Sequence, residues 1–262
     1  MIIGFIGTGK MGGALARAAS KNSDNTLLLA NRHPEKAEAL ASEIGGTADS
    51  AAAVASAAEF LFLGVKPGML GELAGQIKET LCARNSRFVI VSMLAGTEMK
   101  KICDALGIDC PVIRIMPNIP VSIGEGTILY SANSAVTSQD LDDFLSAMKF
   151  SGRFYAIEER LIDAGSAVSG CGPAFAAMFI EALADGGVAC GLPRAAAYEY
   201  AAQMTAGSAK LILDGGILPA GLKDAVCSPG GTTIQGVRAL EENAFRGAVM
   251  DAVIAAYEKT IE

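Results

Sequence analysis

The first 157 residues alternate short apolar runs with amphipathic segments, and this alternation limits the possible folds more than any other feature. Apolar runs of strand length recur at residues 2–6, 26–30, 59–65, 87–93 and 111–116. Helical patterns separate them at residues 10–21, 34–43, 67–82 and 97–106. Strands that alternate with helices at this spacing predict a parallel sheet with helices on both of its faces. Two further strands are expected at residues 126–131 and 152–157, and Thr137-x-x-Asp140 predicts the helix start between them.

The pattern changes after residue 157, where strand-like runs stop and long stretches rich in Ala, Gly, Met and Leu begin. Pro173 and Pro193 lie where helices should start, because proline is tolerated in the first helical turn. The sequence therefore predicts an α/β domain over residues 1–157 and an all-α domain of five to seven helices over residues 158–262.

One predicted helix of the second domain, residues 173–189, is apolar almost all round apart from Glu181 and Asp185. A surface helix of a monomer should carry a polar face. Two interpretations remain open: the second domain packs against a copy of itself in a homodimer, or this helix is the centre of its own bundle.

Composition excludes several classes of protein. The net charge of −7 argues against a nucleic-acid partner, which requires a basic surface. His33 is the only histidine and the six cysteines contain no C-x-x-C pair, so no metal site is expected and most triad mechanisms are excluded. The N-terminus has no signal-peptide pattern, and no run approaches the ~18 apolar residues that span a bilayer. We expect a cytoplasmic protein with no membrane partner and with reduced, buried cysteines.

The opening stretch MIIGFIGTGKMGG fits two phosphate-binding motifs. A P-loop would use Gly4, Gly9 and Lys10, but it requires Ser or Thr where this chain has Met11, and Gly4 would have to leave the first strand. The dinucleotide fingerprint G-x-G-x-x-G fits Gly7, Gly9 and Gly12 at every position. Amides at the start of the next helix would then meet a pyrophosphate. The predicted contacts with the cofactor in this stretch are Gly7, Thr8, Gly9, Lys10, Met11 and Gly12.

The end of the second strand indicates which dinucleotide is bound. An NAD enzyme usually places an acidic residue there to hold the ribose hydroxyls, whereas this chain has Asn31 and Arg32. Arg32 can bind a 2′-phosphate with paired donors, so NADPH is expected as the cofactor and NADH as a weaker alternative. The competing interpretation is that Arg32 is a solvated loop charge.

Later strand ends should contribute further contacts, because ligands of open α/β sheets bind beyond the carboxyl ends of the strands. Lys66 and Asn118 have alternative structural interpretations, as a capping charge and as a turn residue. The residues expected to border the nicotinamide are Lys66, Ala95, Met116, Pro117 and Asn118, and Val65 and Pro67 are expected to contact the cofactor as well.

A loop in the second domain, SPGGTTI at residues 228–234, opens a helical segment. Its free amides would form an anion site suited to a carboxylate, and the alternative is an ordinary helix start with proline in the first turn.

Several motifs together make the chain similar to the pyrroline-5-carboxylate reductase family over essentially all of its length. They are GFIGTGKMGGAL, ANR, VKP, MPNIP, SGCGPAF and, most specifically, DAVCSPGGTTIQGVRALEE at residues 224–242. The resemblance implies a Rossmann-type domain followed by a helical dimerisation domain, and a dimer that assembles further in some family members. It also implies NAD(P)H-dependent reduction of 1-pyrroline-5-carboxylate to L-proline, the last step of proline biosynthesis.

The resemblance assigns roles to the loop at residues 228–233. Its amides and hydroxyls would hold the substrate carboxylate, and Thr233 would face the imine nitrogen as the catalytic residue. Cys171 and Cys227 depart from the hydroxyl residues common in the family, which bears on how the loop is anchored. The predicted substrate contacts are Ser228, Gly230, Gly231, Thr232 and Thr233.

Two other functions stay open. A β-hydroxyacid dehydrogenase has a similar two-domain plan but uses a helix lysine as acid and base, and neither Lys210 nor Lys223 lies in the expected glycine-flanked motif. A non-catalytic NADPH-binding regulator would keep the fold without needing the intact SPGGTTI loop.

Overall fold

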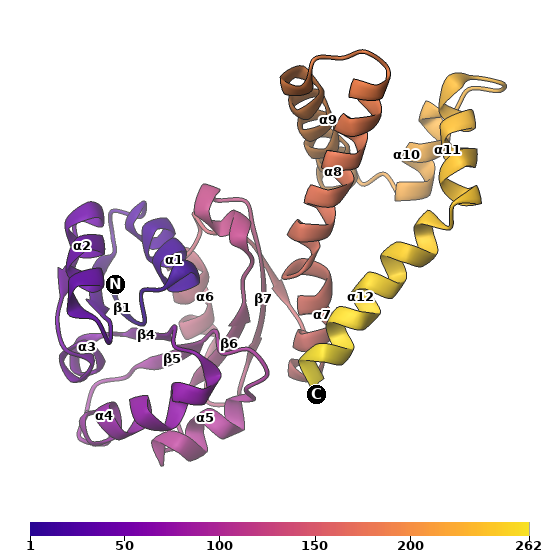
Figure 1. Cartoon of the computed structure of the whole chain (residues 1–262). Coiled ribbons are helices and arrows are strands. Elements are labelled where there is room, and N and C mark those ends of the chain that lie inside the picture. Colours follow the sequence, from indigo (N-terminus) through magenta and orange to yellow (C-terminus); the bar gives the residue numbers. More distant parts are fainter. Residues whose placement is uncertain (262) are drawn as a thin grey trace. The chain divides into compact units, whose positions relative to one another are not determined.

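The computed structural model describes residues 1–261. In this part of the chain one eight-stranded sheet forms, with the order β3-β2-β1-β4-β5-β6-β7-β8 (Figure 1). Strands β1 to β6 run parallel, as the alternation of strands and helices predicts. The strands are β1 (Ile2–Ile6), β2 (Thr26–Ala30), β3 (Thr47–Ala48), β4 (Phe60–Leu63), β5 (Val89–Ser92), β6 (Val112–Met116), β7 (Gly126–Ala132) and β8 (Gly152–Ala156).

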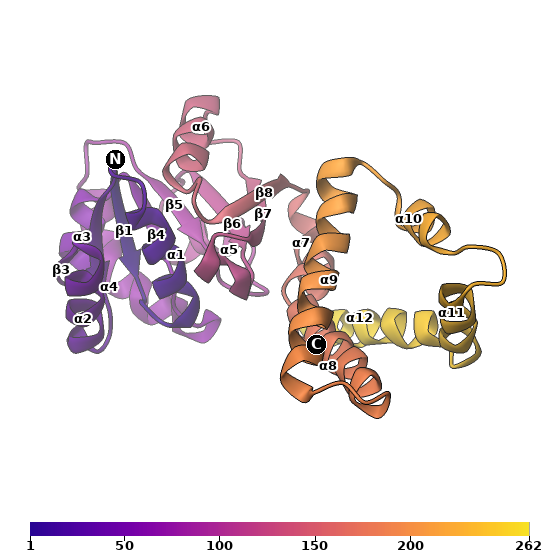
Figure 2. The same cartoon turned by 90° about the horizontal axis from the view of Figure 1, so that it is seen from above.

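Helices cover both faces of this sheet, so the predicted Rossmann-type architecture is confirmed (Figures 1 and 2). One face carries α1 (Lys10–Ser20), α2 (Pro34–Ile44) and α6 (Ser138–Ala147). The other face carries α3 (Ala51–Ala57), α4 (Leu70–Cys82) and α5 (Met99–Leu106). Three short 3-10 helices lie in the connections, at η1 (Pro67–Met69), η2 (Ile119–Ile123) and η3 (Glu159–Leu161).

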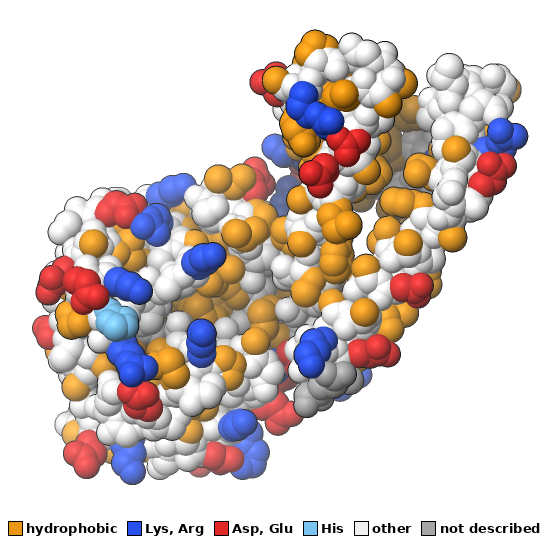
Figure 3. Space-filling model, viewed as in Figure 1, with side chains coloured by type: hydrophobic (Ala, Val, Ile, Leu, Met, Phe, Trp, Pro, Cys, Tyr) orange, Lys and Arg blue, Asp and Glu red, His pale blue; other side chains and the backbone are white. Residues whose placement is uncertain are grey.

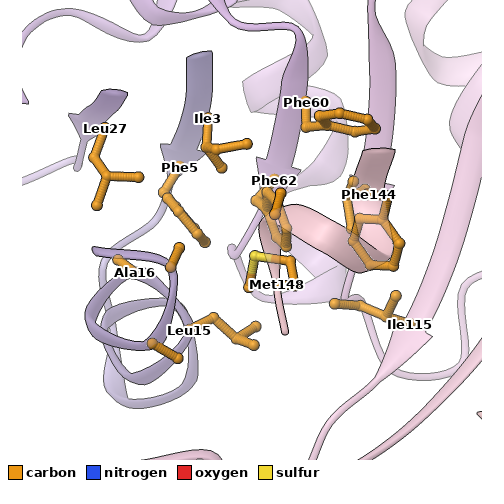
Figure 4. Packing of buried hydrophobic residues seen from close by; sticks show 14 of the residues in the cluster. Ile3, Phe5, Leu15, Ala16, Leu27, Phe60, Phe62, Ile115, Phe144 and Met148 are labelled. Atoms are coloured by element: carbon orange, nitrogen blue, oxygen red, sulfur yellow. The ribbon is translucent and has the colours of Figure 1, made fainter. Parts of the chain in front are cut away.

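The core on the α1 side contains aromatic rings from neighbouring strands (Figure 4). Phe5 of β1 and Phe62 of β4 stack with their ring centroids 4.4 Å apart, and Phe144 of α6 packs beside Phe62. All three side chains are fully buried. Because each parallel strand is covered on both faces, its apolar run is continuous rather than alternating.

Two local features differ from the sequence-based expectation. Strand β7 runs antiparallel to β6, because only η2 connects them and a parallel return would need a longer crossover. The sequence pattern also missed β3 and α3. Helix α3 consists almost entirely of small residues, so it shows no amphipathic period, although Val54 and Ala55 are fully buried against the sheet.

The predicted helix start before α6 is confirmed. The Thr137 hydroxyl accepts a hydrogen bond from the Asp140 amide at 3.1 Å, and the Asp140 carboxylate accepts one from the Thr137 amide at 2.7 Å. This capping box also pairs with Arg87, whose guanidinium donates to both carboxylate oxygens of Asp140. The charge-assisted bonds from Arg87, with smaller contributions from Thr137, hold the pKa of Asp140 well below its usual range.

Residue contacts divide the chain into two compact units. The first contains Met1–Gly170 and the end of the chain from Tyr257 onward, and the second contains Cys171–Ala256. The division falls 13 residues beyond position 157, because η3 and α7 (Ile162–Ser169) pack against β7 within the first unit. All the regular structure after β8 that the structure describes is helical, as expected: α8 (Gly172–Ala189), α9 (Arg194–Gly215), α10 (Pro219–Val226), α11 (Thr232–Glu242) and α12 (Phe245–Ile261) follow α7.

Within the second unit, α8 and α9 pack against each other, while α10 and α11 lie apart from that pair (Figure 2). Helix α8 is not the centre of a closed bundle in this chain, since Ala184 is its only buried residue. Met178 is 69% exposed, and large apolar side chains lie on the surface of this unit (Figure 3).

One helical stretch within residues 1–261, Glu159–Ala189, has the length and composition to cross a membrane. Its 18-residue window has a mean hydropathy of 1.5, so the expectation that no stretch approaches this composition is wrong. The alanines of this stretch raise its hydropathy without making it bulky. Length and composition alone do not separate a membrane span from a helix that a second protein surface covers.

The cysteines also differ in part from expectation. All six are free thiols, but Cys82 and Cys190 are exposed and only Cys110 is fully buried. Burial raises the pKa of the Cys110 thiol to about 12, which makes it a poor nucleophile.

Candidate cofactor and substrate sites

The glycine turn between β1 and α1 has the geometry that the dinucleotide fingerprint requires. Gly7 has φ = +101° and its amide donates to the Ala30 carbonyl at 2.8 Å. A Cβ on Gly12 would collide with the Gly7 carbonyl, so the helix can approach the strand only because position 12 is glycine. A Cβ on Gly9 would meet nothing within 4 Å, which leaves the surface beside the first amides of α1 open. Gly4 lies inside β1, where a P-loop would need it outside the strand.

Thr8 of this turn is tied to the end of β2. The Asn31 side-chain amide donates to the Thr8 hydroxyl at 2.6 Å, and the Asn31 carbonyl oxygen accepts the His33 amide at 3.2 Å. Asn31 therefore connects the loop after β1 to the loop after β2 through hydrogen bonds within the protein.

A cavity of about 480 Å³ opens at these two loops, at the carboxyl edge of the sheet. Six of the predicted cofactor residues line it: Gly7, Gly9, Asn31, Arg32, Val65 and Lys66. Sequence reasoning missed ten others, namely Ile6, Ala30, His33, Lys36, Ala51, Gly64, Met69, Glu72, Leu73 and Gln76. Among these, Lys36 could have been found from sequence, since it follows Arg32 by four residues on the polar side of α2.

The charge around this cavity is mainly positive. Arg32 and Lys36 are exposed at its rim, with Lys66 on the β4 side and Glu72 of α4 as the one carboxylate among the lining residues. His33 Nδ1 lies 3.7 Å from a carboxylate oxygen of Glu35. Basic side chains at the end of β2 are suited to binding a phosphate. NAD enzymes typically have an acidic residue at this position instead.

Four of the residues predicted to lie near the nicotinamide are found at the end of β6 or in the loops after β5 and β6. Ala95 is exposed, Met116 is half-buried, and Pro117 and Asn118 are buried. None of these four lines the cavity described above. The Asn118 amide is used within the protein, since its nitrogen donates to the Ser169 carbonyl at 2.9 Å and its oxygen accepts the Thr127 amide at 2.8 Å.

The predicted substrate loop lies in the second unit, between α10 and α11. Gly230 has φ = +69°, and the Gly231 amide donates to the Ser228 carbonyl at 3.0 Å, which closes a tight turn. Helix α11 begins at Thr232 with Gly231 as its N-cap and no side-chain cap, so Thr232 and Thr233 occupy its first turn with exposed side chains. The first amides of a helix have no intrahelical partner and can bind an anion.

No cluster of three or more His, Cys, Asp or Glu side chains suited to a metal ion occurs in residues 1–261. A glycine turn at the carboxyl edge of a doubly wound sheet, beside a cationic cavity, defines instead the class of dinucleotide-binding α/β proteins.

Comparison with known proteins narrows this class. Residues 2–96 match the family described as "NADP oxidoreductase coenzyme F420-dependent", so the first part of the chain is an NADP-binding domain. Residues 159–262 match "Pyrroline-5-carboxylate reductase dimerisation". The chain is 41% identical to the pyrroline-5-carboxylate reductase of Escherichia coli (strain K12), over 98% of this chain and 96% of that protein.

Two further relatives give the same result. The pyrroline-5-carboxylate reductase of Pisum sativum is 36% identical over 99% of this chain and 95% of its own length. The crystal structure of Plasmodium falciparum pyrroline carboxylate reductase with NADP bound superimposes with a TM-score of 0.87 at 30% identity, covering 100% of this chain and 97% of that one. The chain belongs to the pyrroline-5-carboxylate reductase family of NAD(P)H-dependent oxidoreductases, which confirms the resemblance seen in its motifs.

Proposed function

We propose that this protein reduces 1-pyrroline-5-carboxylate to L-proline with NADPH, the last step of proline biosynthesis. The observation that carries the proposal is near-full-length similarity to pyrroline-5-carboxylate reductases, combined with a glycine turn and cationic cavity of the kind NADPH needs. The bound cofactor would supply a hydride to the imine carbon of the substrate ring.

The preference for NADPH over NADH is assigned to Arg32. Its guanidinium lines the cavity at the end of β2, where a 2′-phosphate would lie, and Lys36 adds a second cation at the same rim. The pyrophosphate would be bound by Gly9 and the first amides of α1, with Thr8, Lys10, Met11 and Gly12 as the neighbouring residues of the turn.

The nicotinamide is assigned to the remaining strand ends of the first domain. Val65, Lys66 and Pro67 follow β4, Ala95 follows β5, and Met116, Pro117 and Asn118 end or follow β6. Because the Asn118 side chain is already bonded within the protein, this residue would act through its backbone and by fixing the loop.

The substrate carboxylate is assigned to the loop Ser228–Thr233. Unpaired amides at the start of α11 suit an anion, and the exposed hydroxyls of Ser228 and Thr232 can add further hydrogen bonds. Gly230 and Gly231 shape the turn that exposes these amides. Thr233 would hydrogen-bond the imine nitrogen while hydride reaches the adjacent carbon, and the nitrogen would take its proton from water or enter already protonated as an iminium.

We also propose that residues 158–262 form the dimerisation and substrate-binding domain and that the homodimer is the working unit. The exposed apolar side chains of Met178 and Leu183 on α8 support this, since exposed apolar surface on a soluble domain often marks contact with a partner. A higher oligomer built from dimers is the alternative assembly. A cytoplasmic location is part of the proposal, supported by the six free thiols.

The test is an assay of NADPH oxidation with 1-pyrroline-5-carboxylate, repeated with NADH and with proline measured as product. Stoichiometric proline formation that is faster with NADPH supports the proposal. A non-catalytic regulator would bind NADPH without oxidising it. A β-hydroxyacid dehydrogenase would instead reduce or oxidise a hydroxyacid pair, using a lysine such as Lys210 or Lys223. Lys223 forms an ion pair with Asp224 at 2.6 Å. The hydrogen bond to this carboxylate raises the pKa of the Lys223 ammonium group and so favours its protonated form.

A further inference from the structure

A buried arginine joins strand β6 to the segment that follows β8. Arg114 is 1% exposed, although arginine is among the residues least often fully buried. Its Nη2 lies 2.9 Å from Oδ1 of Asp163 in the first turn of α7, and its Nη1 lies 3.6 Å from Oε1 of Glu159 in η3. We refer to Arg114, Glu159 and Asp163 as the Arg114 bridge.

The segment held by this bridge also contacts the loop after β5. Oε1 of Glu159 accepts the amide hydrogen of Met99 at 2.6 Å. Met99 is the first residue of α5, and the loop that contains Ala95 lies directly before it. Glu159 therefore links the start of α5 to the guanidinium of Arg114.

The other end of the same segment contacts the loop after β6. The carbonyl of Ser169, the last residue of α7, accepts the side-chain amide of Asn118 at 2.9 Å. Asn118 follows Arg114 by four residues, so β6 and its loop bind α7 at both of its ends. A single segment, Glu159–Ser169, thus contacts the loop after β6 and the end of the loop after β5, which are two of the three loops that the proposed function places beside the nicotinamide.

An ion pair with a buried guanidinium is poorly explained by stability alone, although its carboxylate partners are 27% and 23% exposed. The cost of removing the guanidinium from water offsets much of the attraction, and well-packed apolar residues are often equally stable or more so. What the charges do provide is directional geometry, because a guanidinium and two carboxylates pair in few orientations.

We infer that the Arg114 bridge positions two of the nicotinamide-side loops, those after β5 and β6, for hydride transfer. Arg114, Glu159 and Asp163 are positioning residues, since they act on the reaction through the Ala95 and Asn118 loops. This inference rests on the proposed function. Hydride transfer is sensitive to misplacement of about 1 Å, so a loosened bridge should slow the chemical step more than it weakens cofactor binding.

The test compares Asp163→Asn with wild type, because asparagine keeps the shape of the side chain and removes its charge. We expect kcat to fall roughly tenfold, while the KM for NADPH stays within about twofold. The primary isotope effect with NADPH deuterated at the transferred position should increase, because hydride transfer becomes more rate-limiting. Asp163→Glu, which restores the carboxylate, should recover part of kcat.

Asp104→Asn is the matched control. It removes an exposed ion pair with Lys100 on α5 and should leave kcat and the isotope effect unchanged. A triple variant, Arg114→Met with Glu159→Gln and Asp163→Leu, covers the case in which Asp163→Asn does not fold, since it leaves no uncompensated buried charge. We expect this variant to fold with a Tm near that of wild type and to show the same loss of kcat.

Two results would overturn the inference. One is an unchanged kcat and isotope effect in folded Asp163→Asn and in the triple variant. The other is a fall in Tm that fully accounts for the lost activity, without any change in the isotope effect. If wild type itself does not reduce pyrroline carboxylate, the proposed function is rejected as well, which separates the two failures.

Discussion

The side-chain amide of Asn31 donates a hydrogen bond to the hydroxyl of Thr8, with 2.6 Å between Nδ2 and Oγ1. Because Thr8 belongs to the glycine turn and Asn31 ends β2, this bond couples the site proposed for the pyrophosphate to the site proposed for the 2′-phosphate. The two loops are therefore organised in the protein itself, which lowers the ordering cost when a dinucleotide binds.

Loss of this coupling should weaken both cofactors equally. Asn31→Ala removes one hydrogen bond, worth about 1 kcal/mol, so the Kd values of NADPH and NADH should each rise about fivefold. Fluorescence titration of the two reduced cofactors measures this. Thr8→Ser keeps the hydroxyl and is the control. A weakening confined to NADPH would show that Asn31 contacts the 2′-phosphate directly.

Arg32 should decide between the two cofactors. Removal of a charge-assisted contact costs about 1.5–3 kcal/mol, so Arg32→Ala should raise the KM for NADPH tenfold or more and leave NADH almost unchanged. Lys36→Ala should act in the same direction but less strongly. Lys21→Ala, an exposed cation outside the cavity, is the control. Equal losses for both cofactors would mean that Arg32 has only a structural role.

Thr233 should contribute to the reaction without being indispensable. Orientation and one hydrogen bond are together worth about 1.5–4 kcal/mol, so Thr233→Ala should lower kcat/KM for pyrroline carboxylate by roughly ten- to a thousandfold. NADPH affinity should stay at the wild-type value. Thr232→Ala should cost less, because its amide is the useful group. A fully active Thr233→Ala enzyme would remove the proposed role.

The chain should be at least a dimer at micromolar concentration. Light scattering should give at least twice the chain mass of 26.8 kDa. Met178→Glu places a charge on the exposed apolar side of α8 and should shift the assembly toward monomer. Lys78→Glu on α4 alters charge on the sheet domain and should leave the mass unchanged. An active, monodisperse monomer would contradict this prediction.

The contribution of Asp140 to stability should depend on pH. Its pKa is lowered in the folded protein, mainly by the hydrogen bonds from Arg87, so its stabilisation is present above the unfolded pKa of about 3.9 and is lost as pH falls below it. Asp140→Asn should lower the free energy of unfolding by about 1–2 kcal/mol at pH 7. The effect is no larger because Arg87 is half-exposed and solvent screens its charge.

The measurement is the difference in Tm between wild type and Asp140→Asn from pH 7 down to pH 3. We expect this difference to shrink progressively below about pH 4, because unfolded wild type then takes up a proton at Asp140 while the folded protein still holds the charge. Asp142→Asn on the same helix is the control, because its side chain is exposed. A difference that stays constant over the whole range would show that the carboxylate charge is not what stabilises the cap.

Local features of this protein followed from the sequence because they depend on neighbouring residues. The turn at Gly7 and the helix start at Thr137 and Asp140 were predicted, since each is specified within a few positions of the chain. The strands β1 and β2 were predicted because their apolar runs are continuous. The same reasoning found six of the residues that line the cavity, all of them at the ends of recognised strands or helices.

Other features were decided only by tertiary contacts. The orientation of β7 depends on which strand it meets, and α3 is helical although its small residues carry no period that would reveal it. Asn118 shows the limit most clearly, because its amide is bonded to Ser169, 51 residues away, rather than left free. Arg114 lies in an ordinary apolar run of sequence, and its partners Glu159 and Asp163 lie beyond two further strands. A buried polar group must be paired somewhere, but only packing determines with which residue.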